Sequence, residues 1–234
     1  ASALAGLLPT RRKVVIEPDK SATSAAPALT ALVMPVYNED PADTCAALEV
    51  MAKGLAEIGR AQEFEVFIIS DTRDPLLWVK ETAVFQRLRE QLAESIPVWY
   101  RRRYDNRGRK AGNVRSFISD WGGRYEYIII LDADSLLDPT TMTEMVDRMK
   151  ADPALGLLQT VPRLHRGETL FARLQQFAGF LYGPTVARGV AAWQGRSGNF
   201  WGHNAILRVS AFAASCGLPE LVGKPPFGGS ILSH

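Results

Sequence analysis

The chain has 234 residues, of which 47% are hydrophobic and 9% aromatic, and its 27 Lys and Arg residues nearly balance its 25 Asp and Glu residues. This composition supplies a sizeable apolar core and excludes disorder, collagen and coiled coil as descriptions of the whole chain. A net charge of +2 argues against a protein that mainly coats nucleic acid. No apolar run approaches the roughly 20 residues of a membrane-spanning helix. We therefore expect a soluble globular chain, with Cys45 and Cys216 reduced as in the cytoplasm.

Residues 1–28 are rich in Ala, Ser, Thr and Pro and are predicted to be a leader or linker, with residues 29–234 forming one domain. From residue 29 short apolar runs alternate with amphipathic segments, as in an α/β sheet. Strands are predicted at 32–36, 64–69, 97–101, 127–131 and 155–161, and a helix at 111–120.

Three further helices are predicted to begin at Asp-Pro pairs, at residues 40–41, 74–75 and 138–139. Asp caps a helix N-terminus and Pro fits the first turn. A long helix is predicted at 169–193, where Pro184 is expected to kink or divide it. Its apolar residues are expected to pack in the core, with a membrane surface as the alternative.

Four polar clusters follow four successive predicted strands: residues 37–39, Asp71, the 107–113 loop and residues 132–134. In an open α/β sheet, ligands bind outside the carboxyl ends of the strands. We therefore expect these clusters to converge on one crevice.

The segment Asp132-Ala133-Asp134 is the most specific of these clusters. Residues two apart in an extended chain point to the same side, so both carboxylates can face one ligand. Two such oxygen donors suit Mg²⁺ or Mn²⁺, which complete their coordination with water and substrate phosphates. The pattern favours a metal that holds a nucleotide diphosphate, with a solvated turn as the alternative.

Asp71 could bond a base or ribose, or simply cap a turn. Lys110, with Gly112 and Asn113, could bring a cation and helix N-terminal amides to a phosphate. The run of arginines at 101–103 is expected to be a solvated charge run.

Trp201, His203 and Asn204 could line a sugar pocket, because sugar C–H faces stack on indole while hydroxyls find hydrogen bonds. The alternative is a core tryptophan beside a structural histidine.

Residues 34–39, Asp71, residues 109–113 and residues 131–135 together resemble the processive family-2 glycosyltransferases of GT-A fold, which include the cellulose and hyaluronan synthases. Within residues 101–113, 200–208 and 225–234 the chain is similar to the bacterial inner-membrane synthases of osmoregulated periplasmic glucans. The resemblance covers residues 28–234 and implies an α/β, GT-A type nucleotide-binding fold with a central, mainly parallel sheet flanked by helices.

This resemblance implies a UDP-glucose donor, Mg²⁺ or Mn²⁺, and inverting transfer of glucose to a growing β-glucan acceptor. Tyr37, Glu39 and Asp71 would contact the uridine and Lys110 the nucleotide. The metal would be held by Asp134 and Asp132, and Asp132 would also reach the ribose or diphosphate. The nucleotide-sugar set is completed by Pro35, Asn38 and Asn113, and the acceptor side by Trp201, His203 and Asn204.

In one respect the sequence departs from the resembled family. The catalytic base is an Asp expected just beyond His234, and neither the Gln-x-x-Arg-Trp motif nor the flanking transmembrane helices are present in these residues. We therefore expect part of the cytoplasmic domain of an inner-membrane enzyme. It would bind UDP and metal yet turn over poorly or not at all.

Two other classes of protein remain as alternatives. A sugar-phosphate nucleotidyltransferase would open with a Gly-rich loop after its first strand, where this chain has residues 35–39 instead. A non-catalytic nucleotide-sugar-binding or protein-interaction module is compatible with the missing base.

Overall fold

The computed structural model describes residues 28–215, 220–221 and 229–230, so the predictions for residues 1–27 and most of 216–234 lie outside the described residues. Contacts divide the chain into two compact units, one containing residues 159–201 and the other containing residues 28–158 and 202 onward. A second unit inside the predicted domain was not foreseen. The predicted boundary at residue 28 stays a prediction.

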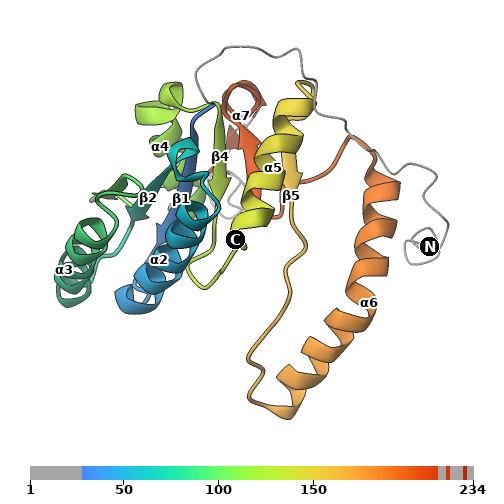
Figure 1. The fold of residues 1–234 in the computed structure, drawn as a ribbon, viewed down its shortest axis with the longest axis horizontal. Coiled ribbons are helices and arrows are strands. Elements are labelled where there is room, and N and C mark those ends of the chain that lie inside the picture. Colours follow the sequence, from blue (N-terminus) through green and yellow to red (C-terminus); the bar gives the residue numbers. More distant parts are fainter. Residues whose placement is uncertain (1–27, 216–219, 222–228, 231–234) are drawn as a thin grey trace. The chain divides into compact units, whose positions relative to one another are not determined.

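The larger unit is organised around a six-stranded sheet in the order β3-β2-β1-β4-β6-β5 (Figure 1). β1 pairs in parallel with β2 and β4, β2 pairs in parallel with β3, and β6 runs antiparallel to β4. The prediction of a central, mainly parallel sheet is thus confirmed. The strands are β1 (Thr30–Val36), β2 (Phe64–Ser70), β3 (Val98–Arg102), β4 (Tyr127–Ile130), β5 (Leu157–Gln159) and β6 (Ala205–Arg208), with a separate antiparallel pair of β7 (Glu220–Leu221) and β8 (Gly229–Ser230).

Helices connect these strands, and the three predicted to begin at Asp-Pro pairs do so. The side chains of Asp40, Asp74 and Asp138 each accept a hydrogen bond from a backbone N–H of the helix that follows. These caps satisfy amides that the first turn leaves without a helical partner. The helices of this unit are α2 (Pro41–Glu57), α3 (Pro75–Gln91), α4 (Arg109–Trp121), α5 (Pro139–Ala151) and α7 (Val209–Ser215), with short 3-10 turns η1 (Ala61–Glu63) and η2 (Gly122–Arg124).

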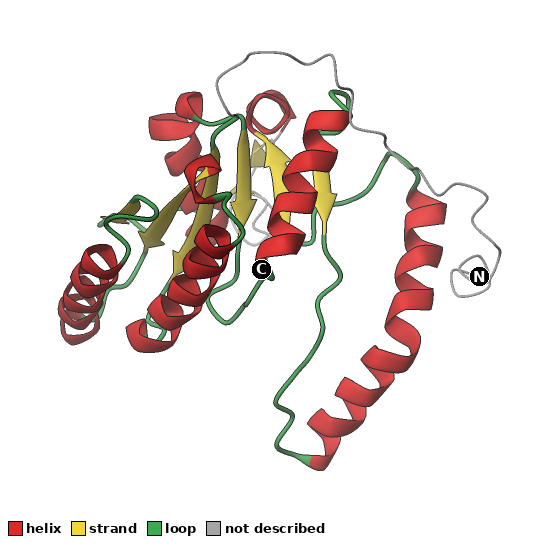
Figure 2. Cartoon of the chain, viewed as in Figure 1, coloured by secondary structure: helices red, strands yellow, loops and turns green. Residues whose placement is uncertain are grey.

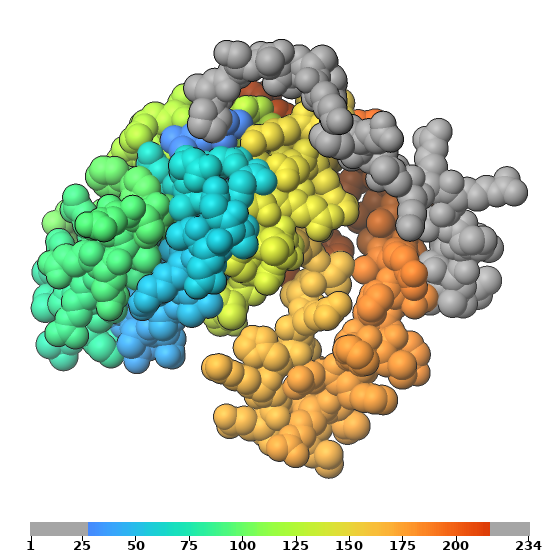
Figure 3. Space-filling view, in the orientation of Figure 1, coloured from blue at the N-terminus to red at the C-terminus, as the bar shows by residue number. Residues whose placement is uncertain are grey.

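The two faces of the sheet bury alternate residues of the same strands, as the two-residue period of a strand requires. In β1, Leu32 and Met34 pack with α2, α3 and α5, whereas Ala31 and Val33 face α4 and Tyr125, with α7 packed at the margin. Figure 2 shows α2, α3 and α5 in front of the strands, and Figure 3 shows their side chains forming this surface. The sheet is therefore covered by helices on both faces, as predicted.

The smaller unit is dominated by α6 (Leu170–Gln194), a 25-residue helix capped by Thr169. Pro184 lies inside it without dividing it, because a proline removes only its own N–H from the helical ladder and residues on both sides stay helical. Gly189 is the one residue of α6 that is buried, and Phe171, Phe180 and Trp193 are each at least 70% exposed. Within its own unit α6 has no further described element beyond Gln159 against which it could pack, so the expectation of core packing stays a prediction.

β5 has three residues rather than the predicted seven, because it lies at the sheet edge, beside the four-residue β6.

Among the described residues, no helix combines the length and apolar character that crossing a bilayer requires.

Candidate functional site

The four polar clusters follow the carboxyl ends of β1, β2, β3 and β4, which run parallel to one another. Strand order β3-β2-β1-β4 means that the chain builds outward from β1 and then returns to its other side with β4. Such a reversal is where open α/β sheets bind ligands. Hydrogen bonds and ion pairs connect each cluster to the next.

Pro35 lies near the end of β1, a central strand, without breaking the sheet. The Val33 carbonyl accepts a hydrogen bond from the Leu131 N–H, on the β4 side of β1. Pro35 is two residues on, so its backbone nitrogen faces the same side, beyond the point where β4 ends. A missing N–H is therefore tolerated there. In the turn after β1, Tyr37 is half exposed and its backbone N–H donates to the carboxylate of Glu39.

Asn38 connects the β1 turn to the β2 turn. Its backbone has φ of 63°, in the left-handed region that Asn tolerates better than most residues. Its N–H donates to Thr72 Oγ1 at 3.0 Å, and its Oδ1 accepts from the Arg73 N–H at 3.3 Å. The turn that carries Tyr37 and Glu39 is thus fixed by residues that follow β2.

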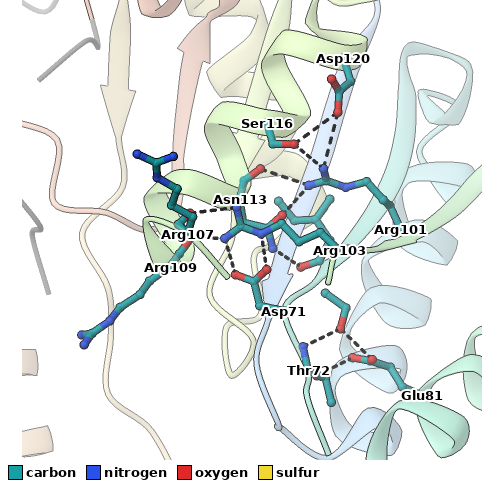
Figure 4. A network of polar contacts seen from close by, with 12 residues as sticks. Asp71, Thr72, Glu81, Arg101, Arg103, Arg107, Arg109, Asn113, Ser116 and Asp120 are labelled. Carbon is teal, nitrogen blue, oxygen red and sulfur yellow. Dashed lines mark hydrogen bonds and ion pairs between the residues drawn. The ribbon is translucent and has the colours of Figure 1, made fainter. Parts of the chain in front are cut away.

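Asp71 is 4% exposed and is held by Arg103 in a two-pronged ion pair (Figure 4). Arg103 Nε and Nη2 donate to the two carboxylate oxygens, the second at 2.8 Å. The same guanidinium donates to the carbonyls of Arg107 at 3.1 Å and Arg109 at 2.8 Å. Arg103 therefore joins the carboxyl end of β2 to the basic loop of residues 107–113. The prediction that residues 101–103 form a solvated charge run is wrong for this residue.

The sequence did contain a signal for this pair, although it depends on strand register. β2 and β3 pair with Ser70 opposite Arg102. Because the strands are parallel, the next residue of each, Asp71 and Arg103, also lie side by side.

The N-terminal end of α4 requires glycine at two positions. Gly108 precedes the helix with φ of 73°, and a Cβ on Gly112 would lie 2.1 Å from the carbonyl oxygen of Arg107. The first turn of α4 holds Arg109 and Lys110 and no acidic residue. Cations at the positive end of a helix dipole are unfavourable unless an anion lies near, so this terminus suits a phosphate.

Asn113 is 1% exposed, and both ends of its amide are engaged. Its Nδ2 donates to the Ile69 carbonyl at 3.0 Å, and its Oδ1 accepts from Arg101. Arg101 also donates to Ser116 Oγ at 2.8 Å. In this structure Asn113 ties α4 to β2, and its predicted contact with a nucleotide stays a prediction.

Asp132 forms an ion pair with Lys110, so the loop after β4 meets the N-terminus of α4. Asp134 is exposed, and among the described residues no hydrogen bond or ion pair involves its carboxylate. No group of three or more metal-ligating side chains occurs in the described part of the chain. Two carboxylates on one loop nonetheless fit Mg²⁺ or Mn²⁺, since such ions draw their other ligands from water and phosphates.

The residues predicted for the acceptor side are divided between the two units. Asn204, with φ of 46°, donates from Nδ2 to Ser135 Oγ at 3.0 Å, and Ser135 N–H bonds to the Asp132 carbonyl at 3.0 Å. Asn204 therefore lies against the loop of the two carboxylates, and His203 is its half-buried neighbour. Trp201 is 48% exposed and belongs to the smaller unit, where its backbone N–H donates to Gln159 Oε1. The predicted acceptor roles stay predictions.

Comparison with known proteins places this chain in a family. The sequence profile described as "Glycosyl transferase family 2" matches residues 31–215. Glucans biosynthesis glucosyltransferase H of Shewanella oneidensis is 48% identical over 233 residues, which are 100% of this chain and 32% of that protein. The protein of the same name from Vibrio cholerae is 51% identical over 205 residues, 88% of this chain and 28% of its own length. The chain thus spans about a third of the first relative's length.

Among solved structures, the mannosyltransferase Ktr4p of S. cerevisiae aligns with 80% of this chain and 57% of its own, at 11% identity and a TM-score of 0.35. A likeness at that level carries no argument about the site.

Proposed function

Because this chain belongs to glycosyl transferase family 2, we propose that the carboxyl ends of β1, β2, β3 and β4 form the donor site for a nucleoside-diphosphate sugar, and that this donor is UDP-glucose. The observation that carries the proposal is the pair of contacts Arg103–Asp71 and Lys110–Asp132, which join three of the four polar clusters through one basic loop. The fourth cluster is joined through Asn38 and Thr72.

The two ends of the site have different chemistry. Tyr37, Glu39 and Asp71 supply hydrogen-bonding groups for the uracil and ribose, on turns held by Asn38 and Arg103. At the other end Lys110 and the α4 N-terminus supply positive charge for the diphosphate. Pro35, near the end of β1, and Asn113, which also ties α4 to β2, complete the proposed nucleotide-sugar set.

Asp134 and Asp132 would hold the divalent cation, Mg²⁺ or Mn²⁺, which supplies Lewis-acid stabilisation of the diphosphate when bound. Lys110 occupies one side of Asp132 and brings a second positive charge to the same place. Fixed positive charge aimed at a leaving group lowers the barrier to its departure, because it acts where negative charge develops. We propose an inverting transfer in which an acceptor hydroxyl displaces UDP in line.

His203 and Asn204, with Trp201, are proposed to face the acceptor, a growing β-glucan. The curated relatives are named for glucan biosynthesis, which supports glucose as the transferred sugar. On the family resemblance we propose that the whole protein lies in the bacterial inner membrane with this part on the cytoplasmic side. Its catalytic base is proposed to be an Asp that follows residue 234, so that the 234-residue chain binds without efficient transfer.

Titration calorimetry tests the donor proposal directly. We expect UDP and UDP-glucose to bind the 234-residue chain, more tightly with Mg²⁺ or Mn²⁺ than with EDTA, and ADP-glucose to bind more weakly. No heat with either uridine nucleotide would favour a protein-interaction module. Rapid transfer of glucose from UDP-glucose by this chain would contradict the proposed position of the base.

A further inference from the structure

Glu81 is a buried carboxylate of α3, 5% exposed, that receives hydrogen bonds from three hydroxyl groups; Figure 4 shows it beside Thr72. Ser70 Oγ donates to Oε2 at 2.8 Å, Tyr100 OH donates to Oε2 at 2.9 Å, and Thr72 Oγ1 donates to Oε1 at 3.4 Å. None of the ion pairs found in the described residues includes it. Burial raises the pKa of this carboxyl group, and the three donors oppose that effect.

The absence of a cation partner distinguishes Glu81 from the other buried glutamates of this unit. Glu63 pairs with Arg60 and Lys150, and Glu65 pairs with Arg124. A carboxylate buried without a cation is costly. A neutral side chain of the same shape would fill the same space without that cost. What a carboxylate adds is that it can only accept hydrogen bonds.

That property fixes the direction of two hydroxyl groups. The Ser70 and Thr72 hydroxyls must point their hydrogens at Glu81, which leaves their lone pairs for backbone amides. Ser70 Oγ accepts the Thr72 N–H at 3.1 Å, and Thr72 Oγ1 accepts the Asn38 N–H at 3.0 Å. A chain of hydrogen bonds therefore runs from Glu81 through Thr72 to Asn38, the left-handed residue between Tyr37 and Glu39.

We propose that Glu81 is a positioning residue for the uridine end of the donor site: it orients the Thr72 hydroxyl to accept the Asn38 N–H and so holds the turn of residues 37–39 in its ligand-receiving conformation. This inference rests on the proposed function. It assigns no contact between Glu81 and the ligand, because its carboxylate is buried and used by Ser70, Thr72 and Tyr100.

Glu81→Gln reverses the direction of this chain while keeping the shape. An amide nitrogen placed toward Thr72 donates to its hydroxyl oxygen and takes one of the two lone pairs. The hydroxyl hydrogen is then no longer directed at residue 81 and competes with the Asn38 N–H for the other side of the oxygen, which weakens that hydrogen bond. Thr72→Val removes the acceptor outright, whereas Thr72→Ser restores it. Tyr100→Phe deletes one donor to the same carboxylate without touching Thr72, so it is the matched control for general destabilisation.

The experiment measures UDP binding by calorimetry and hydrogen exchange at the Asn38 amide in the unliganded proteins, after thermal unfolding has shown that each variant is folded. We expect Glu81→Gln and Thr72→Val to weaken UDP binding about tenfold, as the loss of one buried hydrogen bond does. Exchange at Asn38 should be faster in both. Thr72→Ser and Tyr100→Phe should stay near the unsubstituted chain in both readouts.

Unchanged UDP affinity and unchanged Asn38 exchange in Thr72→Val and Glu81→Gln would overturn the inference, as would equal losses in Tyr100→Phe. If Glu81→Gln does not fold, the Thr72→Val and Thr72→Ser pair decides alone. If the unsubstituted chain does not bind UDP, the proposed function fails, and the exchange measurement still decides whether Glu81 fixes the turn.

Discussion

Replacing Arg103 with methionine is the sharpest test of how the site is assembled. The substitution keeps much of the apolar stem and removes the guanidinium that joins Asp71 to the carbonyls of Arg107 and Arg109. The side chains of Asp71 and Arg103 are 4% and 15% exposed, so the carboxylate left behind has little access to water.

Removing one partner of a buried ion pair costs about 3 to 5 kcal/mol, because an uncompensated charge stays buried. We expect a loss near the lower end of that range, since Asp71 follows the carboxyl end of β2, where local rearrangement can admit water. Adding Asp71→Asn to Arg103→Met removes the stranded charge, so the double variant should be more stable than Arg103→Met alone.

Urea unfolding at neutral pH measures these free energies. Arg148→Met is the matched control, because Arg148 pairs with Glu144 and both side chains are more than half exposed. Such a pair contributes about 0 to 1 kcal/mol. If Arg103→Met costs no more than Arg148→Met, the ion pair does not assemble the site and the reasoning is refuted.

Three further predictions concern the loop, the metal and acid stability. Gly112→Ala should destabilise the chain by about 1 to 3 kcal/mol by overpacking against the Arg107 carbonyl, whereas Gly123→Ala, whose Cβ would meet nothing within 4 Å, should unfold at nearly the unsubstituted temperature. Lys110→Met should weaken UDP binding but strengthen Mn²⁺ binding without nucleotide, because it frees Asp132 from its ion pair with Lys110. If calorimetry finds that both UDP and Mn²⁺ bind more weakly, Lys110 and the metal do not compete for Asp132. Burial raises the pKa of Glu63, but the ion pairs with Arg60 and Lys150 outweigh it and hold that pKa below 4.5. Its stabilising effect is therefore complete above pH 4.5 and lost as pH falls through the lowered value, so Glu63→Gln should flatten the decline of unfolding free energy with acid, and an unchanged slope would argue against it.

Much of the fold follows from local signals in the sequence. The Asp-Pro pairs at 40–41, 74–75 and 138–139 predict three helix starts, because cap and first turn involve neighbouring residues only. The apolar run 127–131 predicts a strand covered on both faces, as β4 is. The position of the polar clusters follows from the same strands, since each cluster comes directly after a strand end.

What could not be predicted depends on residues far apart in the chain. The Arg103–Asp71 pair requires the register of β2 against β3, and Glu81 meets Ser70, Thr72 and Tyr100 only because α3 brings it to them. The apolar residues of α6 indicate burial, but they do not say what covers them, and the described part of its own unit supplies no partner.

The central claim is that the four polar clusters form one donor site, and the most direct measurement is UDP affinity in the presence and absence of Mn²⁺ for Asp71→Asn and Asp134→Asn. Asp147→Asn is the control, because this carboxylate lies on α5 and pairs with Arg60. The account predicts that Asp71→Asn weakens UDP binding with or without metal, that Asp134→Asn removes only the gain from Mn²⁺, and that Asp147→Asn changes neither. Equal UDP binding by all three variants, with the gain from Mn²⁺ intact, would contradict the account.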